Sequence, residues 1–134
     1  MRRAYVDTCL FIYWVEQTSA QTGAALRWLE GNADADLCVS PLVRLETLVK
    51  PMRLQQLAII KAYEVLLDAQ TWLAINDEVF ARALDLRCRF GLKTPDALHL
   101  ATAQQHDCDE FWTNDNRLKF AAGPMAVNVF ERKM

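Results

Sequence analysis

The sequence predicts an α/β fold in which a mostly parallel sheet of about five short strands lies between layers of helices. Short runs of β-favouring residues alternate with longer helical patterns along the chain, which is typical of repeated βαβ units. No linker, repeat or low-complexity tract interrupts the 134 residues, so we expect a single domain spanning residues 1–134. The 52% hydrophobic and 24% charged content is that of a globular domain and argues against disorder.

Five segments have the composition of short strands. In the first of them, Tyr5 and Val6 favour extended backbone. A strand so near the start of the sequence must be held in a sheet to persist. The predicted strands are residues 4–7, 37–40, 71–75, 110–113 and 125–130.

Helical patterns occupy the intervals between these strands. We expect Thr8 to cap the first helix, Pro51 to end the helix that begins after Ser40, and Thr94 to cap the helix that carries Asp96. The predicted helices are residues 8–15, 24–30, 41–50 and 53–69, then one between Asn76 and Gly91 and one beginning at residue 94.

Cysteine spacing and hydropathy exclude several classes of protein. The four cysteines have no CxxC spacing, so neither a zinc site nor a redox motif is predicted, and we expect four unpaired, buried thiols. No apolar run approaches the ~20 residues that cross a bilayer, and the Met-Arg-Arg start has no secretory pattern. The sequence therefore predicts a cytoplasmic location without membrane contact.

Four acidic residues stand out from their surroundings. Asp7 ends the first strand among apolar neighbours, and Asp115 follows the strand at 110–113. Glu46 and Asp96 lie on helices that are otherwise too apolar to carry a stray charge cheaply. Each acid alone has a structural explanation, as a solvated or helix-capping carboxylate. Because open α/β sheets bind ligands at the carboxyl ends of their strands, we expect all four to converge into one pocket.

A pocket of four carboxylates needs protons or cations to offset its repulsion. Mg²⁺ is the natural cation, with Mn²⁺ as a substitute, because hard divalent ions prefer oxygen ligands. Two such ions can activate water and stabilise in-line attack at phosphorus. With the four carboxylates neutralised, the formal net charge of −2 becomes −2 + 4 = +2, so the acidic balance does not exclude a nucleic-acid substrate.

Four motifs, in this order, resemble those of PIN-domain nucleases and, more narrowly, of VapC toxins of type II toxin–antitoxin systems. They are Tyr5-Val6-Asp7-Thr8, Ser40-Pro41 through Glu46-Thr47, Thr94-Pro95-Asp96-Ala97-Leu98-His99-Leu100-Ala101, and Phe111-Trp112-Thr113-Asn114-Asp115. The resemblance implies a PIN-like three-layer fold and an Mg²⁺-dependent endoribonuclease that cleaves RNA and inhibits translation. It also implies a VapB-like antitoxin as partner, and a homodimer.

The resemblance assigns roles to individual residues. It implies that Asp7, Glu46, Asp96 and Asp115 are the catalytic acids. Within that set, it implies that Asp7 and Asp96 bind the metal and that Thr113 has a supporting role. Cys9 departs from the pattern, because many relatives have Asn there, which leaves open whether this side chain reaches the site.

The other polar residues near these motifs have two interpretations each. We interpret His99 as a hydrogen-bonded structural residue rather than a base, since it lies on a buried helix. The basic residues that flank the acids either bind phosphates or are solvated surface charges. They are Arg44, Lys93, Arg117 and Lys119.

Two other functions are weighed against the nuclease. A phosphatase of the haloacid-dehalogenase type also places an Asp after its first strand, but it needs a second Asp where Cys9 stands. A receiver domain needs paired acids and a late Lys, and neither pattern is present. The second alternative is a catalytically silent module on the same fold that acts by binding RNA or an antitoxin, whose helix would dock on the apolar helices of the first half.

Overall fold

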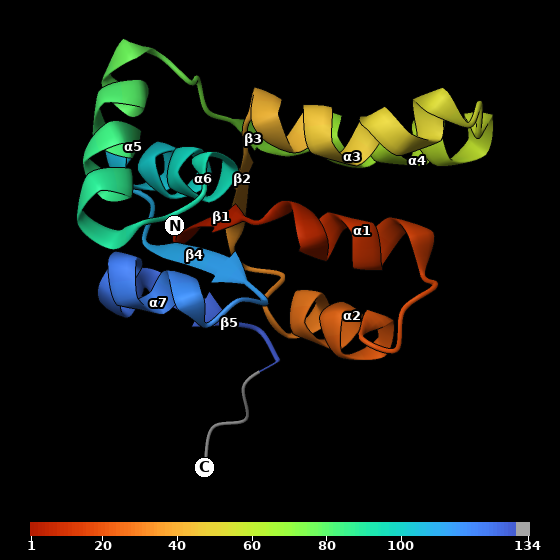
Figure 1. The fold of residues 1–134 in the computed structure, drawn as a ribbon. Helices are drawn as coiled ribbons and strands as arrows, with labels where there is room; N and C mark the ends of the chain where they lie inside the picture. Colours follow the sequence, from red (N-terminus) through yellow and green to blue (C-terminus); the bar gives the residue numbers. More distant parts are fainter. Residues whose placement is uncertain (131–134) are drawn as a thin grey trace.

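The computed structural model describes residues 1–130, in which five strands form one fully parallel sheet (Figure 1). The strands are β1 (Arg3–Val6), β2 (Asp36–Val39), β3 (Thr71–Trp72), β4 (Glu110–Thr113) and β5 (Ala126–Asn128). Their order in the sheet is β3-β2-β1-β4-β5, so the first strand lies at the centre. From β1 the chain builds outward on one side through β2 and β3, then returns to add β4 and β5 on the other. The α/β prediction is confirmed.

Helices cover both faces of the sheet. They are α1 (Thr8–Glu16), α2 (Thr22–Gly31), α3 (Pro41–Arg53), α4 (Leu57–Asp68), α5 (Asp77–Phe90), α6 (Thr94–Gln105) and α7 (Arg117–Ala122), with a 3₁₀ turn, η1, at Gly123–Met125. The buried Tyr5 ring stacks on Phe111 at 5.5 Å and lies against His99 of α6. Trp112 points the other way, because successive strand residues alternate between faces, and meets Trp28 of α2 edge-on. The sheet is therefore the middle of three layers.

The helix boundaries differ from the prediction around Pro51. We expected Pro51 to end its helix, but α3 continues to Arg53, with Pro51 buried inside it. A proline this close to the helix end removes only one backbone hydrogen bond of the last turns, and its burial offsets part of that cost. A turn with Gln55 at φ 55° follows, so α4 begins at Leu57 rather than at residue 53.

The two edge strands are shorter than predicted. The strand expected at 71–75 pairs only at Thr71–Trp72, and the strand expected at 125–130 spans Ala126–Asn128 after the 3₁₀ turn. An edge strand has a neighbour on one side only, so less of its length is fixed by pairing. The helix α7 was not predicted.

Two predicted caps and part of the predicted cysteine burial are wrong. Thr8 and Thr94 are the first residues of their helices, not the residues that cap them, and the capping positions belong to Asp7 and Lys93. All four cysteines are free, as expected, but Cys88 on α5 is exposed and Cys9 is only partly buried. Among the described residues, no helix is long and apolar enough to span a membrane.

Candidate active site

Asp7 lies at the point in the sheet where the order of strand addition reverses. It follows the central strand β1, and its backbone N–H donates to the carbonyl of Trp112 in β4 at 2.9 Å. The chain extends from β1 to one side and from β4 to the other, so this edge is a topological switch point, where parallel sheets open a crevice. Asp115 lies just beyond the end of β4 at the same edge.

The Asp7 carboxylate is partly buried and held by a threonine. The hydroxyl of Thr113, itself fully buried at the end of β4, donates to Oδ2 of Asp7 at 2.9 Å. The same hydroxyl oxygen accepts the backbone N–H of Asp115 at 3.1 Å. Burial raises the pKa of Asp7 and the charge of Asp96 adds to that rise, while His99 and the Thr113 hydroxyl oppose it. Thr113 thus links two of the predicted acids.

Glu46 is brought to the same place from the middle of α3. Its Oε1 accepts a hydrogen bond from the Thr8 hydroxyl at 2.7 Å and lies 2.6 Å from Nε2 of His99. The Glu46 side chain keeps 28% of its surface exposed, whereas His99 keeps 2%. Burial acts to raise the pKa of Glu46, but the hydrogen bond and charge of His99 and the Thr8 hydroxyl outweigh it and leave the pKa lowered.

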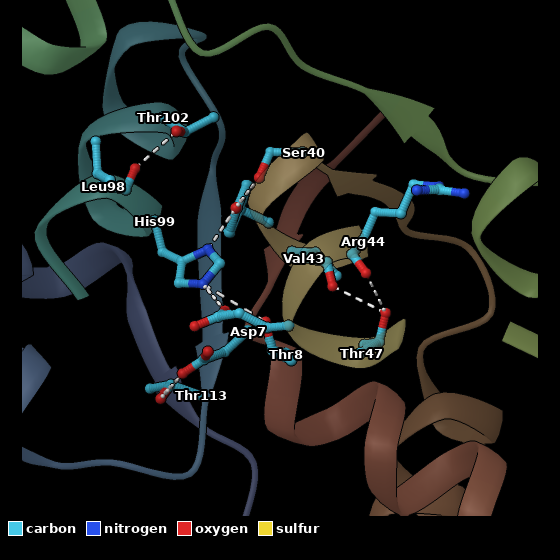
Figure 2. Close-up of polar contacts among 12 residues, drawn as sticks. Asp7, Thr8, Ser40, Val43, Arg44, Thr47, Leu98, His99, Thr102 and Thr113 are labelled. Carbon is cyan, nitrogen blue, oxygen red and sulfur yellow. Dashed lines mark hydrogen bonds and ion pairs between the residues drawn. The ribbon is translucent and has the colours of Figure 1, made fainter. Parts of the chain in front are cut away.

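A chain of buried hydrogen bonds lies behind Glu46. Nδ1 of His99 is 2.6 Å from the hydroxyl of Tyr5, and that hydroxyl is 2.8 Å from Oγ of Ser40. Figure 2 shows Asp7, Thr8 and Thr113 grouped on one side of the His99 ring and Ser40 on the other. Since a carboxylate only accepts, Nε2 of His99 carries the proton that bonds Glu46. His99 is thus buried and hydrogen-bonded through both ring nitrogens, as expected of a structural residue.

Asp96 and Asp115 line a shared pocket of about 200 Å³. Arg117 donates hydrogen bonds to the Asp115 carboxylate from its side-chain Nε and Nη2 and from its own backbone N–H, at 2.6–3.0 Å. These bonds with Arg117 lower the pKa of Asp115. Asp96, in the first turn of α6, has a raised pKa, first through burial and then through the charge of Asp115.

The four predicted acids therefore lie at one edge of the sheet. Glu46 and Asp115 both act on the pKa of Asp96, and Asp96 acts on that of Asp7. Within residues 1–130, however, no three acidic, histidine or cysteine side chains are arranged so that they could hold a metal ion by themselves. The four acids offer only oxygen donors, the ligand type that hard divalent cations take.

Three residues that hydrogen-bond at the site were not predicted from the sequence to be part of it. They are Thr8, Tyr5 and Ser40. Ser40 and Thr8 follow strands β2 and β1, and polar residues just after strand ends were the available signal. Cys9 lies in the first turn of α1, where burial raises the pKa of its thiol, so it contributes no charge to the site.

The basic residues that flank the acids divide into two groups. Lys93 and Arg117 line the pocket that holds Asp96 and Asp115. The side chain of Arg44 is directed away from the residues around His99, as Figure 2 shows. Lys119 lies two residues further along α7, outside the residues that line this pocket. Only the first two are placed to meet a ligand in the pocket.

Comparison with known proteins gives a family and a set of similar folds. The sequence pattern of the PIN domain matches residues 4–124. A chain of a toxin–antitoxin complex from Klebsiella pneumoniae is 26% identical, with a TM-score of 0.77 over 96% of this chain and 99% of that one. No curated protein matches the sequence significantly.

Two further solved structures share the fold at lower identity. A Mycobacterium tuberculosis VapC toxin described as cleaving the sarcin–ricin loop is 19% identical, with a TM-score of 0.74 over 93% of this chain and 97% of that one. A VapBC complex from Rickettsia felis bound to promoter DNA is 13% identical, with a TM-score of 0.74 over 93% and 97% of the two chains.

Proposed function

Because this chain belongs to the PIN-domain family, we propose that it is an Mg²⁺-dependent endoribonuclease and the toxin of a toxin–antitoxin pair. Similarity to a chain of the Klebsiella pneumoniae toxin–antitoxin complex over almost the full length of both chains supports the pairing. The observation that most supports a nuclease activity is that Asp7 and Asp96 lie near each other at the switch point of the sheet, close enough for the charge of Asp96 to raise the pKa of Asp7. A bound cation would offset the repulsion between these neighbouring carboxylates.

Asp7 and Asp96 are the residues that would hold Mg²⁺, and Mn²⁺ would substitute. Their oxygen donors suit a hard cation, and the neighbouring Asp115 and Glu46 add negative charge at Asp96. When bound, the ion supplies positive charge that lowers the pKa of a water molecule and stabilises charge developing on the phosphate.

Glu46 is suited to orient the attacking water by accepting a hydrogen bond from it. Its pKa is lowered, so it is ionised at neutral pH, and both of its hydrogen bonds go to Oε1. Oε2 is left to face a water molecule or substrate hydroxyl. His99, fixed on its far side by Tyr5, holds this carboxylate in one orientation. Arg117 does the same for Asp115, and Thr113 for Asp7.

The antitoxin would dock on α3 and α4. Leu45, Val49 and Met52 follow one another at helical spacing on α3 and are 46–63% exposed. A groove of about 360 Å³ beside them is lined by Val49, Lys50, Arg53 and Leu54. An amphipathic segment of a VapB-like antitoxin with acidic residues near its apolar face would match both the apolar stripe and the two cations.

The direct test is cleavage by the purified protein. A labelled messenger RNA should be cut with Mg²⁺ or Mn²⁺, and cutting should stop with EDTA and resume when the metal is added back. Expression without the antitoxin should inhibit translation in cells. If the Asp7→Asn and Asp96→Asn proteins keep the full cellular effect, the chain is instead a catalytically silent binding module.

A further inference from the structure

An aromatic pair lies beside the pocket that contains Asp96 and Asp115. Phe120, on α7, is 82% exposed, which makes it the most exposed large apolar side chain of the described part after Met1. Its ring meets Phe90 edge-on with 5.8 Å between the ring centres. Phe90, at the end of α5, lines the pocket itself. A solitary exposed apolar residue needs no explanation, but here two rings adjoin a polar cavity.

Positive charge surrounds these rings. Lys93 and Arg117 line the pocket, and the guanidinium of Arg89 lies 5.4 Å from the centre of the Phe90 ring. Arg117 uses Nε and Nη2 to bind Asp115, so Nη1 stands outside that pair, and 77% of the side chain is exposed. Cations thus adjoin both the acids and the Phe90 ring.

We propose that this region is a binding subsite for one unpaired nucleotide of a single-stranded RNA, next to the phosphate that is cut. Lys93 and Arg117 bind the backbone phosphate. The base stacks on Phe120, whose ring is held by its edge-on contact with Phe90. The inference rests on the proposed nuclease function for its placement. It adds which part of the surface binds the substrate, and that the substrate is single-stranded there.

The chemistry of the region favours a nucleotide over a protein. Sites for single-stranded nucleic acid combine a basic groove with aromatic faces on which bases stack. A protein partner would need a larger apolar area than two rings supply. A volume of about 200 Å³ between acids and rings accommodates part of one nucleotide, not a side-chain cluster.

The test uses a short single-stranded RNA that carries 2-aminopurine, whose fluorescence falls when the base stacks. Titration of the wild-type protein, with Ca²⁺ in place of Mg²⁺ and RNA integrity checked on a gel, should quench the signal. Phe120→Ala should weaken binding about tenfold and remove most of the quenching, whereas Phe120→Trp should retain both. Lys93→Gln should weaken binding and make it less dependent on salt.

Phe80→Ala is the matched control, since Phe80 is also exposed, at 55%, but lies near the start of α5. It should bind RNA as the wild type does, and a duplex of the same sequence should show no dependence on Phe120. Wild-type affinity and quenching in Phe120→Ala would overturn the subsite. Unchanged RNA affinity with altered oligomeric state on gel filtration would also overturn it, and would assign Phe120 to a contact between copies.

Failure of the subsite and failure of the proposed function are distinguishable. If the wild type cleaves RNA but Phe120→Ala binds and cleaves equally well, only the subsite is wrong. If the wild type binds and quenches the RNA but never cuts it with Mg²⁺, the subsite stands and the nuclease proposal is wrong.

Discussion

Two threonine hydroxyls hold the carboxylates of the site from within the protein. Thr113 donates to Asp7 at 2.9 Å and Thr8 to Glu46 at 2.7 Å. A hydroxyl that donates to a carboxylate favours its ionised form and fixes its orientation. Such supporting bonds matter for a metal site nearly as much as the ligands themselves. Small side chains next to the acids therefore contribute to the proposed chemistry without touching the substrate.

Replacing Thr113 by Val should weaken metal binding. Val matches the shape of Thr but removes the hydroxyl that orients Asp7, so the Mn²⁺ dissociation constant measured by calorimetry should rise at least tenfold. Thr102→Val is the control, because the buried Thr102 hydroxyl bonds only to the carbonyl of Leu98 in its own helix. Equal metal affinity in the two variants would remove the supporting role of Thr113.

Replacing His99 should affect both stability and turnover. His99→Ala removes one hydrogen-bond partner from the partly buried Glu46 and one from the buried Tyr5 hydroxyl, so the free energy of unfolding should fall by about 2 kcal/mol in urea titrations. The rate constant kcat should also fall, with KM nearly unchanged, since Glu46 is no longer held. His99→Gln keeps an N–H donor towards Glu46 and should recover part of kcat. Loss of stability with full kcat would make His99 purely structural.

At this scale the sequence revealed the acids better than their partners. Asp7, Glu46 and Asp96 were recognisable because each is out of place beside an apolar strand or in an apolar helix, and Asp115 because it follows a strand. Thr8 was misread as a helix cap, since a threonine after a strand fits that role equally well. The bonds of Tyr5 to His99 and Ser40 join residues 94 and 35 positions apart, and no local pattern predicts such pairings.

Helices α3 and α4 form the proposed docking surface for the antitoxin. They pack against each other and against α1, yet α3 exposes the apolar stripe Leu45, Val49 and Met52. The same helix turns Glu46 inward to the site. One element thus links the proposed antitoxin surface with the proposed active site. A partner bound along α3 would lie close to Glu46.

Charge placed on this stripe should separate neutralisation from catalysis. Val49→Asp should abolish binding of the cognate antitoxin in a co-purification assay, because it buries a charge in an apolar contact. RNA cleavage by the same protein should stay within a factor of about two, as surface substitutions rarely disturb the fold. Leu84→Asp, at a 66% exposed position on α5, is the control and should leave antitoxin binding intact. Retained antitoxin binding in Val49→Asp would place the docking surface elsewhere.

Element types were predicted better than element ends. Amphipathic or apolar periodicity identified α1 to α6, and β-favouring runs identified all five strands. The end of α3 was missed because a proline near a helix end is tolerated, and α7 was missed because Arg117–Ala122 is too short to show periodicity. The pairing order of the strands depends on contacts across the sheet and could not be read from any one segment.

The whole molecule concentrates negative charge at one edge of its sheet. Because β1 is central and the strands are parallel, residues that follow β1 and β4 meet at the switch point, and α3 and α6 add Glu46 and Asp96. Burial and mutual repulsion raise the pKa of Asp7 and Asp96, so the ionised forms of these groups cost stability in the folded protein. A cation bound between Asp7 and Asp96 would offset this loss of stability.

Metal binding should therefore stabilise the folded protein. At an Mg²⁺ concentration one hundred times the dissociation constant, linkage predicts a gain of about 2.7 kcal/mol in the free energy of unfolding. In EDTA, Asp96→Asn should be more stable than the wild type, since it removes one of the repelling charges, and Mg²⁺ should stabilise it less. Thermal unfolding of both proteins with and without Mg²⁺ checks this. An Asp96→Asn protein that is less stable in EDTA would contradict the repulsion.

The central claim is that the acids at the switch point perform metal-dependent RNA cleavage, and single-turnover cleavage by Asp96→Asn tests it most directly. Circular dichroism and gel filtration should first show that the variant is folded like the wild type. With Mg²⁺ present, its rate constant should be lower by a factor of about one hundred or more, since a ligand and a charge of the site are lost. A folded Asp96→Asn protein that cleaves RNA at the wild-type rate would contradict the account.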